Sequence, residues 1–201
     1  ITGNKSLNPK MVLTHVINGE TYLDSGKTVT SVDDGAIKAE QNIGLMAQGL
    51  KAPTVPGVTW KEANYEIENY GTIDFSAARK STAIYSESAR VKNDGTIKVG
   101  ENSTGIYGIY KDGTRKFEGS GSGAKNKLEI TTTTNSKINL GNNSTGMYLV
   151  NAQKLDNLGG EIKSTTGATK NVGIYALNGA IGEAAYDKDV NYNILTMNNK
   201  A

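Results

Sequence analysis

Short clusters of apolar residues alternate with polar residues along most of the chain, and turn-forming residues separate one cluster from the next. In the cluster Thr96–Val99 the apolar side chains occupy every second position. This alternation predicts a strand with one buried face, because successive side chains of a strand point to opposite sides of a sheet. The clusters end at Asn-Gly, Asp-Gly or Gly-Gly pairs, which favour turns. We therefore predict an all-β fold of many short strands.

The clusters belong to a unit that repeats along the chain. Its clearest copy spans residues 93–107 and reads Asn-Asp-Gly-Thr-Ile-Lys-Val-Gly-Glu-Asn-Ser-Thr-Gly-Ile-Tyr, and a second copy spans residues 135–148. Looser copies begin near Asp34, Asn69 and Asn157. The first isoleucine of the five copies lies at Ile37, Ile73, Ile97, Ile138 and Ile162. Two of the spacings are 24 residues, and the longer spacings of 36 and 41 indicate the same period with an insertion.

Each copy offers three short strands, since a further apolar position precedes each isoleucine. These positions are Val32, Ile67, Val91, Ile130 and Leu155. No single copy could bury its apolar side alone, but stacked copies would enclose a continuous apolar column, as in solenoid proteins. We predict a right-handed parallel β-helix (β-solenoid) of about five coils, with three short strands per coil and loop insertions.

The chain is interpreted as a single β-helical fragment over residues 1–201. We assign residues 1–30 to an irregular, cap-like N-terminal segment and residues 31–178 to the repeats. Residues 179–201 are predicted to hold a loop and the start of a further coil, because Asn198-Asn199-Lys200-Ala201 resembles the opening of another unit. We expect the native chain to continue there.

The alternation also assigns side chains to the inside or the outside of the column. Ile97 and Val99 share one face and are predicted to point inward. In the Gly-Ile-Tyr strands we favour an inward aliphatic residue and an outer ladder of tyrosines, while the opposite orientation stays open. The inward set is Ile84, Ile106, Met147 and Ile174, and the outer ladder is Tyr85, Tyr107, Tyr148 and Tyr175. Asparagine side chains at the turns can hydrogen-bond their counterparts in neighbouring coils.

Composition narrows the possible functions. The 201 residues include 24 glycines, which the turns explain, and 36% hydrophobic residues, which suffice for a narrow column. There is no cysteine, and the single histidine, His15, cannot form a histidine cluster, so disulfides and metal sites of these kinds are excluded. The net charge of +2 argues against electrostatic binding of nucleic acid. No apolar run approaches the length of about 18 residues that a membrane-spanning helix needs.

The unit Asn-x-Gly-Thr-Ile followed by Asn-Ser-Thr-Gly-Ile/Met-Tyr resembles the passenger repeats of large fusobacterial type V (autotransporter) outer-membrane adhesins. The resemblance covers roughly residues 31–178 with interruptions and is strongest at residues 93–107 and 135–148. It implies a cell-surface, extracellular β-helical stalk in a virulence-associated protein, anchored in the outer membrane through a C-terminal barrel that this chain lacks. It identifies no binding residues, because the repeat motif is a scaffold motif.

The resemblance implies an adhesin that attaches to a host-cell receptor protein, a host glycan or the surface of a partner bacterium. We expect a monomer that needs no cofactor, has no metal site and is not an enzyme. The alternatives are a fragment of a β-helical polysaccharide lyase or hydrolase, and a toxin passenger. The enzyme is disfavoured on the expectation that no coil offers neighbouring outward carboxylates at aligned positions with a nearby arginine.

The insertions are the candidate ligand-binding regions, since solenoids carry functional loops on their outer surface. The insertion at residues 48–64 holds the only tryptophan, Trp60, beside prolines, and the insertion at residues 108–127 is basic and glycine-rich. The candidate ligand-binding residues are Trp60, Lys111, Arg115 and Lys116. In the alternative interpretation, Trp60 anchors its loop against the coil and the basic loop is a solvated spacer.

Other motifs have simpler structural explanations. Residues 187–191 have the ligand spacing of a calcium loop, but Tyr192 replaces its glycine and Asn198 its final glutamate. Asp33 and Asp34 lie beside a glycine, where a polar turn accounts for them. His15 lies in a predicted strand and is interpreted as a surface or edge histidine. We predict no catalytic residue.

Overall fold

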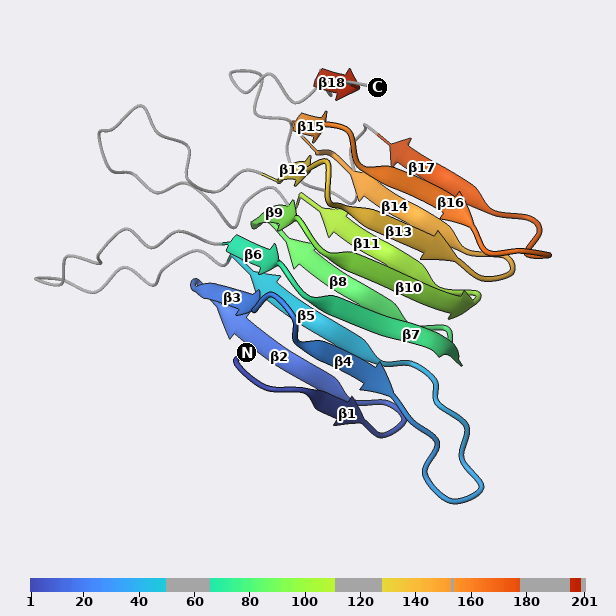
Figure 1. Cartoon of the computed structure of the whole chain (residues 1–201). Coiled ribbons are helices and arrows are strands. Elements are labelled where there is room, and N and C mark those ends of the chain that lie inside the picture. The colour runs from blue at the N-terminus through green and yellow to red at the C-terminus, as the bar shows by residue number, and fades with distance from the viewer. Residues whose placement is uncertain (50–65, 111–127, 153, 178–195, 200–201) are drawn as a thin grey trace, which may run out of the picture.

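A computed structural model describes residues 1–49, 66–110, 128–152, 154–177 and 196–199. These residues form 18 short strands in three parallel sheets of six strands each. Successive strands of the chain belong to different sheets. From β4 onward, each strand pairs with the strand that lies three positions before it in the chain, so that the chain winds into a stacked column (Figure 1). The prediction of a parallel β-helix is therefore confirmed.

The three sheets are named A, B and C in the order in which the chain visits them. Sheet A contains β1 (Lys5–Leu7), β4 (Thr28–Ser31), β7 (Thr72–Arg79), β10 (Thr96–Glu101), β13 (Lys137–Leu140) and β16 (Glu161–Ser164). Sheet B contains β2 (Val12–Ile17), β5 (Ile43–Gln48), β8 (Thr82–Glu87), β11 (Thr104–Ile109), β14 (Thr145–Val150) and β17 (Val172–Leu177). Sheet C contains β3 (Glu20–Leu23), β6 (Glu66–Asn69), β9 (Arg90–Asn93), β12 (Glu129–Thr132), β15 (Lys154–Asn157) and β18 (Thr196–Asn199).

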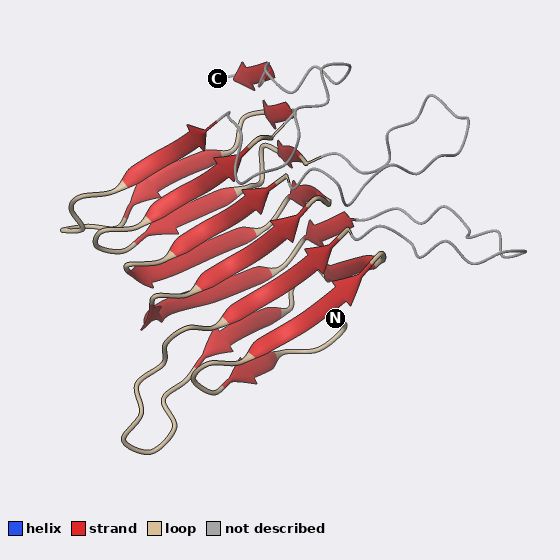
Figure 2. Ribbon diagram, turned by 180° about the vertical axis from the view of Figure 1, so that it is seen from behind, coloured by secondary structure: helices blue, strands red, loops and turns tan. Residues whose placement is uncertain are grey.

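One strand from each sheet makes a coil, and coils 1 to 6 are stacked in chain order (Figure 2). The part of the chain that the structure describes contains no helix, and hence no helix long and apolar enough to cross a membrane.

The core is a set of apolar columns, each built from equivalent residues of successive coils. Ile73, Ile97 and Ile138 stack in sheet A and are at most 1% exposed. The corresponding column of sheet B contains Ile84, Ile106 and Met147, and that of sheet C contains Ile67, Val91 and Ile130. The inward orientation predicted for the Gly-Ile-Tyr strands is thus confirmed, although Ile174 in the last coil is only partly buried against the core.

The assignment of residues 1–30 to an irregular cap is wrong. Strands β1, β2 and β3 form coil 1, and β4 begins coil 2, which makes six coils instead of about five. Val29, not Ile37, pairs with Ile73, and Thr21, not Val32, pairs with Ile67. The sequence misled because Asp34-Gly35-Ala36-Ile37 imitates the motif. Ile37 lies instead in a loop, 54% exposed, with backbone bonds to Asp34.

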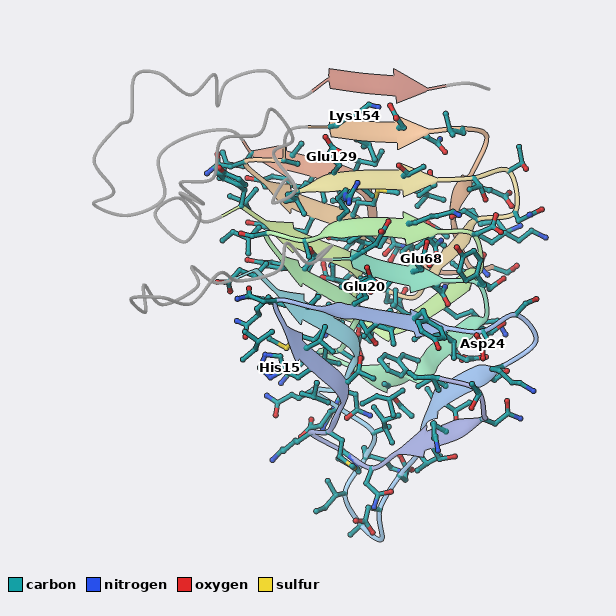
Figure 3. The ribbon with its side chains drawn as sticks, turned by 90° about the vertical axis from the view of Figure 1, so that its left-hand side faces the viewer. His15, Glu20, Asp24, Glu68, Glu129 and Lys154 are labelled. Carbon is teal, nitrogen blue, oxygen red and sulfur yellow. The ribbon has the colours of Figure 1, made fainter. Side chains whose placement is uncertain are left out.

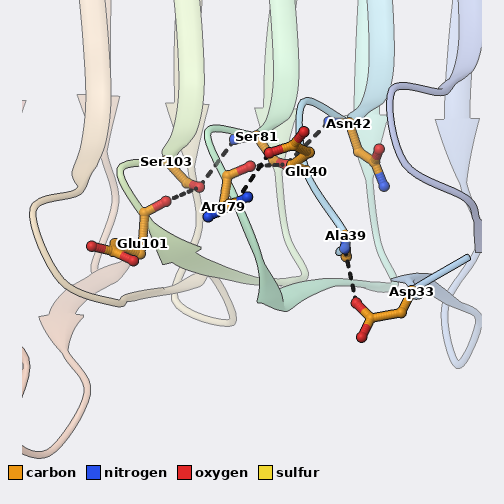
Figure 4. Close-up of polar contacts among 8 residues, drawn as sticks. All are labelled: Asp33, Ala39, Glu40, Asn42, Arg79, Ser81, Glu101 and Ser103. Atoms are coloured by element: carbon orange, nitrogen blue, oxygen red, sulfur yellow. Dashed lines mark hydrogen bonds and ion pairs between the residues drawn. The ribbon is translucent and has the colours of Figure 1, made fainter. Parts of the chain in front are cut away.

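Buried polar ladders run along the corners of the column. In sheet C the Asn69 Nδ2 donates to Asn93 Oδ1 at 2.7 Å, as predicted for asparagines at the turns. Between sheets A and B a serine ladder takes this role: the backbone N–H of Ser81 donates to Ser103 Oγ at 3.0 Å (Figure 4), and that of Ser103 donates to Ser144 Oγ at 3.1 Å. Each coil thereby satisfies a buried backbone donor of its neighbour.

The two ends of the core differ in polarity. In coil 1 the register positions of the three central columns are taken by Lys5, Thr14 and Thr21. In coil 6 the corresponding columns of sheets A and B keep apolar residues, Ile162 and Ile174. In these central columns the N-terminal end is therefore polar and the C-terminal end apolar, although Leu7 and Leu23 of coil 1 are buried beside them.

Candidate interaction surface

Three long insertions connect to the column at one corner. The segments 50–65, 111–127 and 178–195 lie outside the described residues, but the strands on both sides of each are described. Each segment leads from a strand of sheet B to the next strand of sheet C: β5 to β6, β11 to β12, and β17 to β18. The chain thus leaves and re-enters the column at the corner between sheets B and C, in coils 2, 4 and 6.

In the alternate coils the same corner is tight. In the described residues of the turns after β2, β8 and β14, the left-handed conformation is adopted by Asn18 (φ 52°), Ser88 (φ 67°) and Asn151 (φ 54°). Since neighbouring strands lie about 4.8 Å apart, the points where the insertions leave are spaced by about 10 Å along the column. The spacing of the insertions along the column is a property of the fold that the repeat period of the sequence did not reveal.

All the predicted ligand-binding residues belong to these insertions. Trp60, Lys111, Arg115 and Lys116 lie outside the described residues, as do residues 187–195 of the calcium-like motif. The predictions made for them therefore remain predictions. What the described residues establish is that the loops of coils 2 and 4 begin and end at the same edge, beside the outer face of sheet C.

The outer face of sheet C carries two columns of charged side chains that sequence reasoning missed (Figure 3). The first column, in register order, is Glu20, Glu66, Arg90, Glu129 and Lys154. The second is Tyr22, Glu68, Lys92, Thr131 and Asp156. Opposite charges mostly face each other along these columns, except that Glu66 lies directly beside Glu20.

These columns correct an expectation from the sequence. We expected no neighbouring outward carboxylates at aligned positions with an arginine nearby, but Glu20, Glu66 and Arg90 occupy successive positions of one column. The relation was hidden because the segment 50–65 lies between β3, which holds Glu20, and β6, which begins with Glu66. Only the register brings Glu20 beside Glu66.

Burial and charge both act on Glu66. Partial burial raises the pKa of the Glu66 carboxyl, the nearby Arg90 opposes the rise, and the negative charges of Glu68 and Glu20 add to it. A carboxyl group that keeps its proton to higher pH can donate it to a bound molecule. Burial and the neighbouring carboxylates therefore favour the protonated form of Glu66.

A hydrogen-bonded chain crosses from coil 2 to coil 3 on the same face. The Lys92 Nζ donates to the Tyr70 hydroxyl at 3.0 Å, and this hydroxyl donates to Glu68 Oε1 at 2.9 Å. The Lys92 ammonium also lies 4.9 Å from the centre of the Tyr70 ring. The hydrogen bond to Tyr70 is the main cause that raises the pKa of Lys92. These hydrogen bonds hold the Lys92 ammonium, the Tyr70 phenol and the Glu68 carboxylate together in one polar patch.

The other residues considered in the sequence have structural roles. Asp33 accepts hydrogen bonds from Lys38 Nζ at 2.7 Å and from the backbone N–H of Ala39 at 2.8 Å (Figure 4), and the bond from Lys38 chiefly lowers the pKa of Asp33. The His15 Nε2 lies 2.5 Å from Gln48 Oε1, an amide. Among the described side chains, no group of three or more His, Cys, Asp or Glu could hold a metal ion.

Comparisons with protein-family models, with curated proteins and with solved structures found no match for this chain.

Proposed function

We propose that this chain is a segment of a surface-exposed β-helical adhesin passenger, in which the column is a stalk and the insertions present the binding residues. The observation that carries the proposal is that all three insertions leave the column at the corner between sheets B and C. Loops on one edge of a rigid scaffold can contact a single partner together. The resemblance of the repeats to fusobacterial type V passengers supports the choice of an adhesin.

The proposed partner is a host-cell receptor protein or glycan, or the surface of another bacterium, and the proposed location is the outside of the bacterial outer membrane. Trp60 from the first insertion and Lys111, Arg115 and Lys116 from the second would provide aromatic and cationic contacts. No cofactor is required for this role. The column acts as a monomeric spacer, whose stacked coils resist bending because every coil is bonded to its neighbours by three strands.

Shortened corners test the role of the insertions. Coil 3 turns the same corner with Glu87-Ser88-Ala89-Arg90, so deletion of residues 50–64 or of residues 111–127 leaves a connection of equal length. We expect each deletion to weaken binding of the fluorescently labelled chain to cultured epithelial cells or to bacterial cells, and the double deletion to abolish it. Far-ultraviolet circular dichroism should stay unchanged.

The matched control alters the same corner without removing a loop. Glu129→Gln changes a charge on sheet C next to the second insertion and should leave cell binding intact. The triple variant Trp60→Ala/Arg115→Ala/Lys116→Ala should reproduce the loss seen with the deletions. Full binding by the double deletion would refute the proposal that the insertions carry the adhesive site.

The second candidate is a polysaccharide lyase or hydrolase, favoured by one observation: Glu66, with its raised pKa, lies beside Glu20 and Arg90 on an exposed sheet face. A pair of neighbouring carboxyl groups is the minimum for acid–base cleavage of a glycosidic bond. Release of reducing ends or unsaturated products from acidic polysaccharides, abolished by Glu66→Gln, would support the enzyme. Absence of release with intact cell binding would favour the adhesin.

A further inference from the structure

The tyrosine ladder brings phenol rings from four successive coils into direct contact. The ring centres of Tyr85 and Tyr107 lie 5.2 Å apart with 4° between the ring planes. Tyr107 and Tyr148 have the same separation with 3° between their planes, and Tyr148 and Tyr175 lie 4.8 Å apart at 19°. The strands are parallel and the tyrosines pair in register, so equivalent side chains of neighbouring coils stack along the column.

The ladder lies on the outer face of sheet B, where solvent reaches it. Tyr175 is 43% exposed, and Tyr85, Tyr107 and Tyr148 are half-buried. The apolar residues beside them in the strands, such as Ile106, point to the opposite side and are fully buried. The phenol rings are thus accessible to small oxidants, while the core beneath them is not.

We infer that the ladder is an oxidative cross-linking site, at which a peroxidase and hydrogen peroxide join tyrosines of adjacent coils as dityrosine. Each phenol gives one electron to the oxidant and one proton to solvent, which leaves two phenoxyl radicals. The radicals form a carbon–carbon bond between ring positions ortho to the hydroxyls. Each of these carbons then loses its proton, and the ring is restored as a phenol. Two tyrosines lose two hydrogen atoms in total, and one peroxide becomes two waters.

Proximity selects the neighbours along the ladder over other pairs. Groups held in contact react as if at very high concentration, whereas two separate chains must first meet. Tyr22 and Tyr70 have different surroundings: Tyr22 pairs with Glu68 in sheet C, and Tyr70 binds Glu68 and Lys92. The product would fasten coils 3 to 6 covalently along the outside of the column. This inference does not depend on the proposed adhesive function.

The experiment oxidises the full chain at high dilution with a peroxidase and hydrogen peroxide. The monomer fraction is isolated by gel filtration, and dityrosine is measured by its fluorescence and by mass spectrometry of cross-linked peptides. We expect links between Tyr85 and Tyr107, Tyr107 and Tyr148, and Tyr148 and Tyr175. Oxidation of the chain unfolded in urea should lose this selectivity.

Phenylalanine variants remove the phenols and keep the stacked rings. Tyr107→Phe/Tyr148→Phe separates the two remaining ladder tyrosines by three coils and should lose the cross-links. Tyr22→Phe/Tyr70→Phe removes the same number of phenols from sheet C and its turns, and should keep them. Tyr148→Phe alone should leave the link between Tyr85 and Tyr107 as the single ladder product.

The inference is overturned if Tyr107→Phe/Tyr148→Phe forms as much dityrosine in the monomer as the unmodified chain. Cross-links in the unmodified monomer that map only to tyrosines off the ladder would overturn it as well. Circular dichroism of each variant before oxidation identifies any loss of the fold. If the double variant does not fold, the single Tyr148→Phe variant still tests the inference, because it removes only one hydroxyl group.

Discussion

At the scale of single residues, the corner between sheets A and B explains the most regular part of the sequence motif. One residue in each of three successive coils adopts the left-handed conformation there, with φ values of 51° to 53° at Lys80, Asn102 and Asn143. Asparagine tolerates this conformation better than most residues. A buried serine follows each of them, and its hydroxyl accepts the backbone N–H of the preceding coil. The Asn-Ser-Thr sequences are therefore turn chemistry.

Gly95 offers a test at a second corner, between sheets C and A. A Cβ added at Gly95 would overlap the carbonyl oxygen of Gly71 in the coil below. We expect Gly95→Ala to lower the free energy of unfolding by about 2 to 3 kcal/mol, because backbone atoms must move to make room. Chemical denaturation measures the change.

The control for Gly95→Ala is Gly3→Ala. A Cβ at Gly3 meets nothing within 4 Å, so the free energy of unfolding should change by about 0.5 kcal/mol or less. Equal effects of the two substitutions would contradict the tight packing of the corner.

At the scale of elements, the sheets are held together by contacts between equivalent positions of neighbouring strands. The outer face of sheet A shows this with a pair between β7 and β10: Lys98 Nζ lies 2.8 Å from Asp74 Oδ2. Asp74 Oδ1 also accepts the Ser76 hydroxyl at 2.5 Å and its backbone N–H at 3.1 Å. The pair links two coils on the solvent side, opposite the core column of Ile73 and Ile97.

This pair predicts a pH dependence of stability. Burial alone would raise the pKa of Asp74, but the hydrogen bonds from Lys98 and Ser76 outweigh it, and the pKa lies below its ordinary value of 3.8. A lowered pKa in the folded state stabilises the fold above the unfolded value and loses this effect as pH falls through the folded value. Asp74→Asn should therefore destabilise the chain at neutral pH and have little effect well below pH 3.8.

Denaturant titrations of both proteins at neutral and strongly acidic pH provide the measurement. Lys137→Asn is a suitable control, since Lys137 is an exposed residue of the same sheet. Its effect on stability should not vary over the acidic range in this way. A constant difference between Asp74→Asn and the unmodified chain at all pH values would contradict the prediction.

At the scale of the whole molecule, the column has two unlike ends. Lys5, Thr14 and Thr21 end the central columns at coil 1, whereas Ile162 and Ile174 lie at the other end. Both end coils expose apolar side chains. In the first coil these are Met11 (46%), Val12 (42%) and Ile17 (54%), and in the last coil Val172 (42%), Tyr175 (43%) and Leu177 (41%). The difference between the two ends therefore concerns the residues of the central columns.

An added coil should stabilise the C-terminal face. Asn199 occupies the register position that Asn69 has in coil 2. A copy of residues 71–93 placed after Lys200, in place of Ala201, would therefore follow Asn199 at the same spacing at which Thr72 follows Asn69. We expect the melting temperature and the free energy of unfolding to rise, since each apolar side chain that becomes fully covered contributes about 1.5 to 3 kcal/mol. Calorimetry and denaturation measure both quantities.

The matched control carries Ile73→Lys and Ile84→Lys within the added copy, because a lysine at an inward position imitates the polar end formed by Lys5. This control should give no stabilisation. If the two extended chains were equally stable, the difference in polarity between the ends would have no energetic consequence.

The sequence by itself determined the fold class and the period, and it favoured the orientation of the Gly-Ile-Tyr strands that the structure then decided. The alternation around Ile97 and the repeated Gly-Ile-Tyr strands were enough, because a solenoid uses the same local pattern in each coil. The tyrosine ladder and the asparagine ladder followed from the same pattern. Coil 1 was missed because the motif positions of its central columns are polar, as at Thr14 and Thr21, although Leu7 and Leu23 are buried.

Only the tertiary structure decided which residues become neighbours across insertions. The register places Glu20 beside Glu66, and it brings the ends of all three insertions to one corner. Spacing along the chain cannot give this information, because an insertion changes the number of residues between two strands without changing their pairing. The backbone hydrogen bonds of the sheets fix that pairing, and the surface chemistry of the column depends on it.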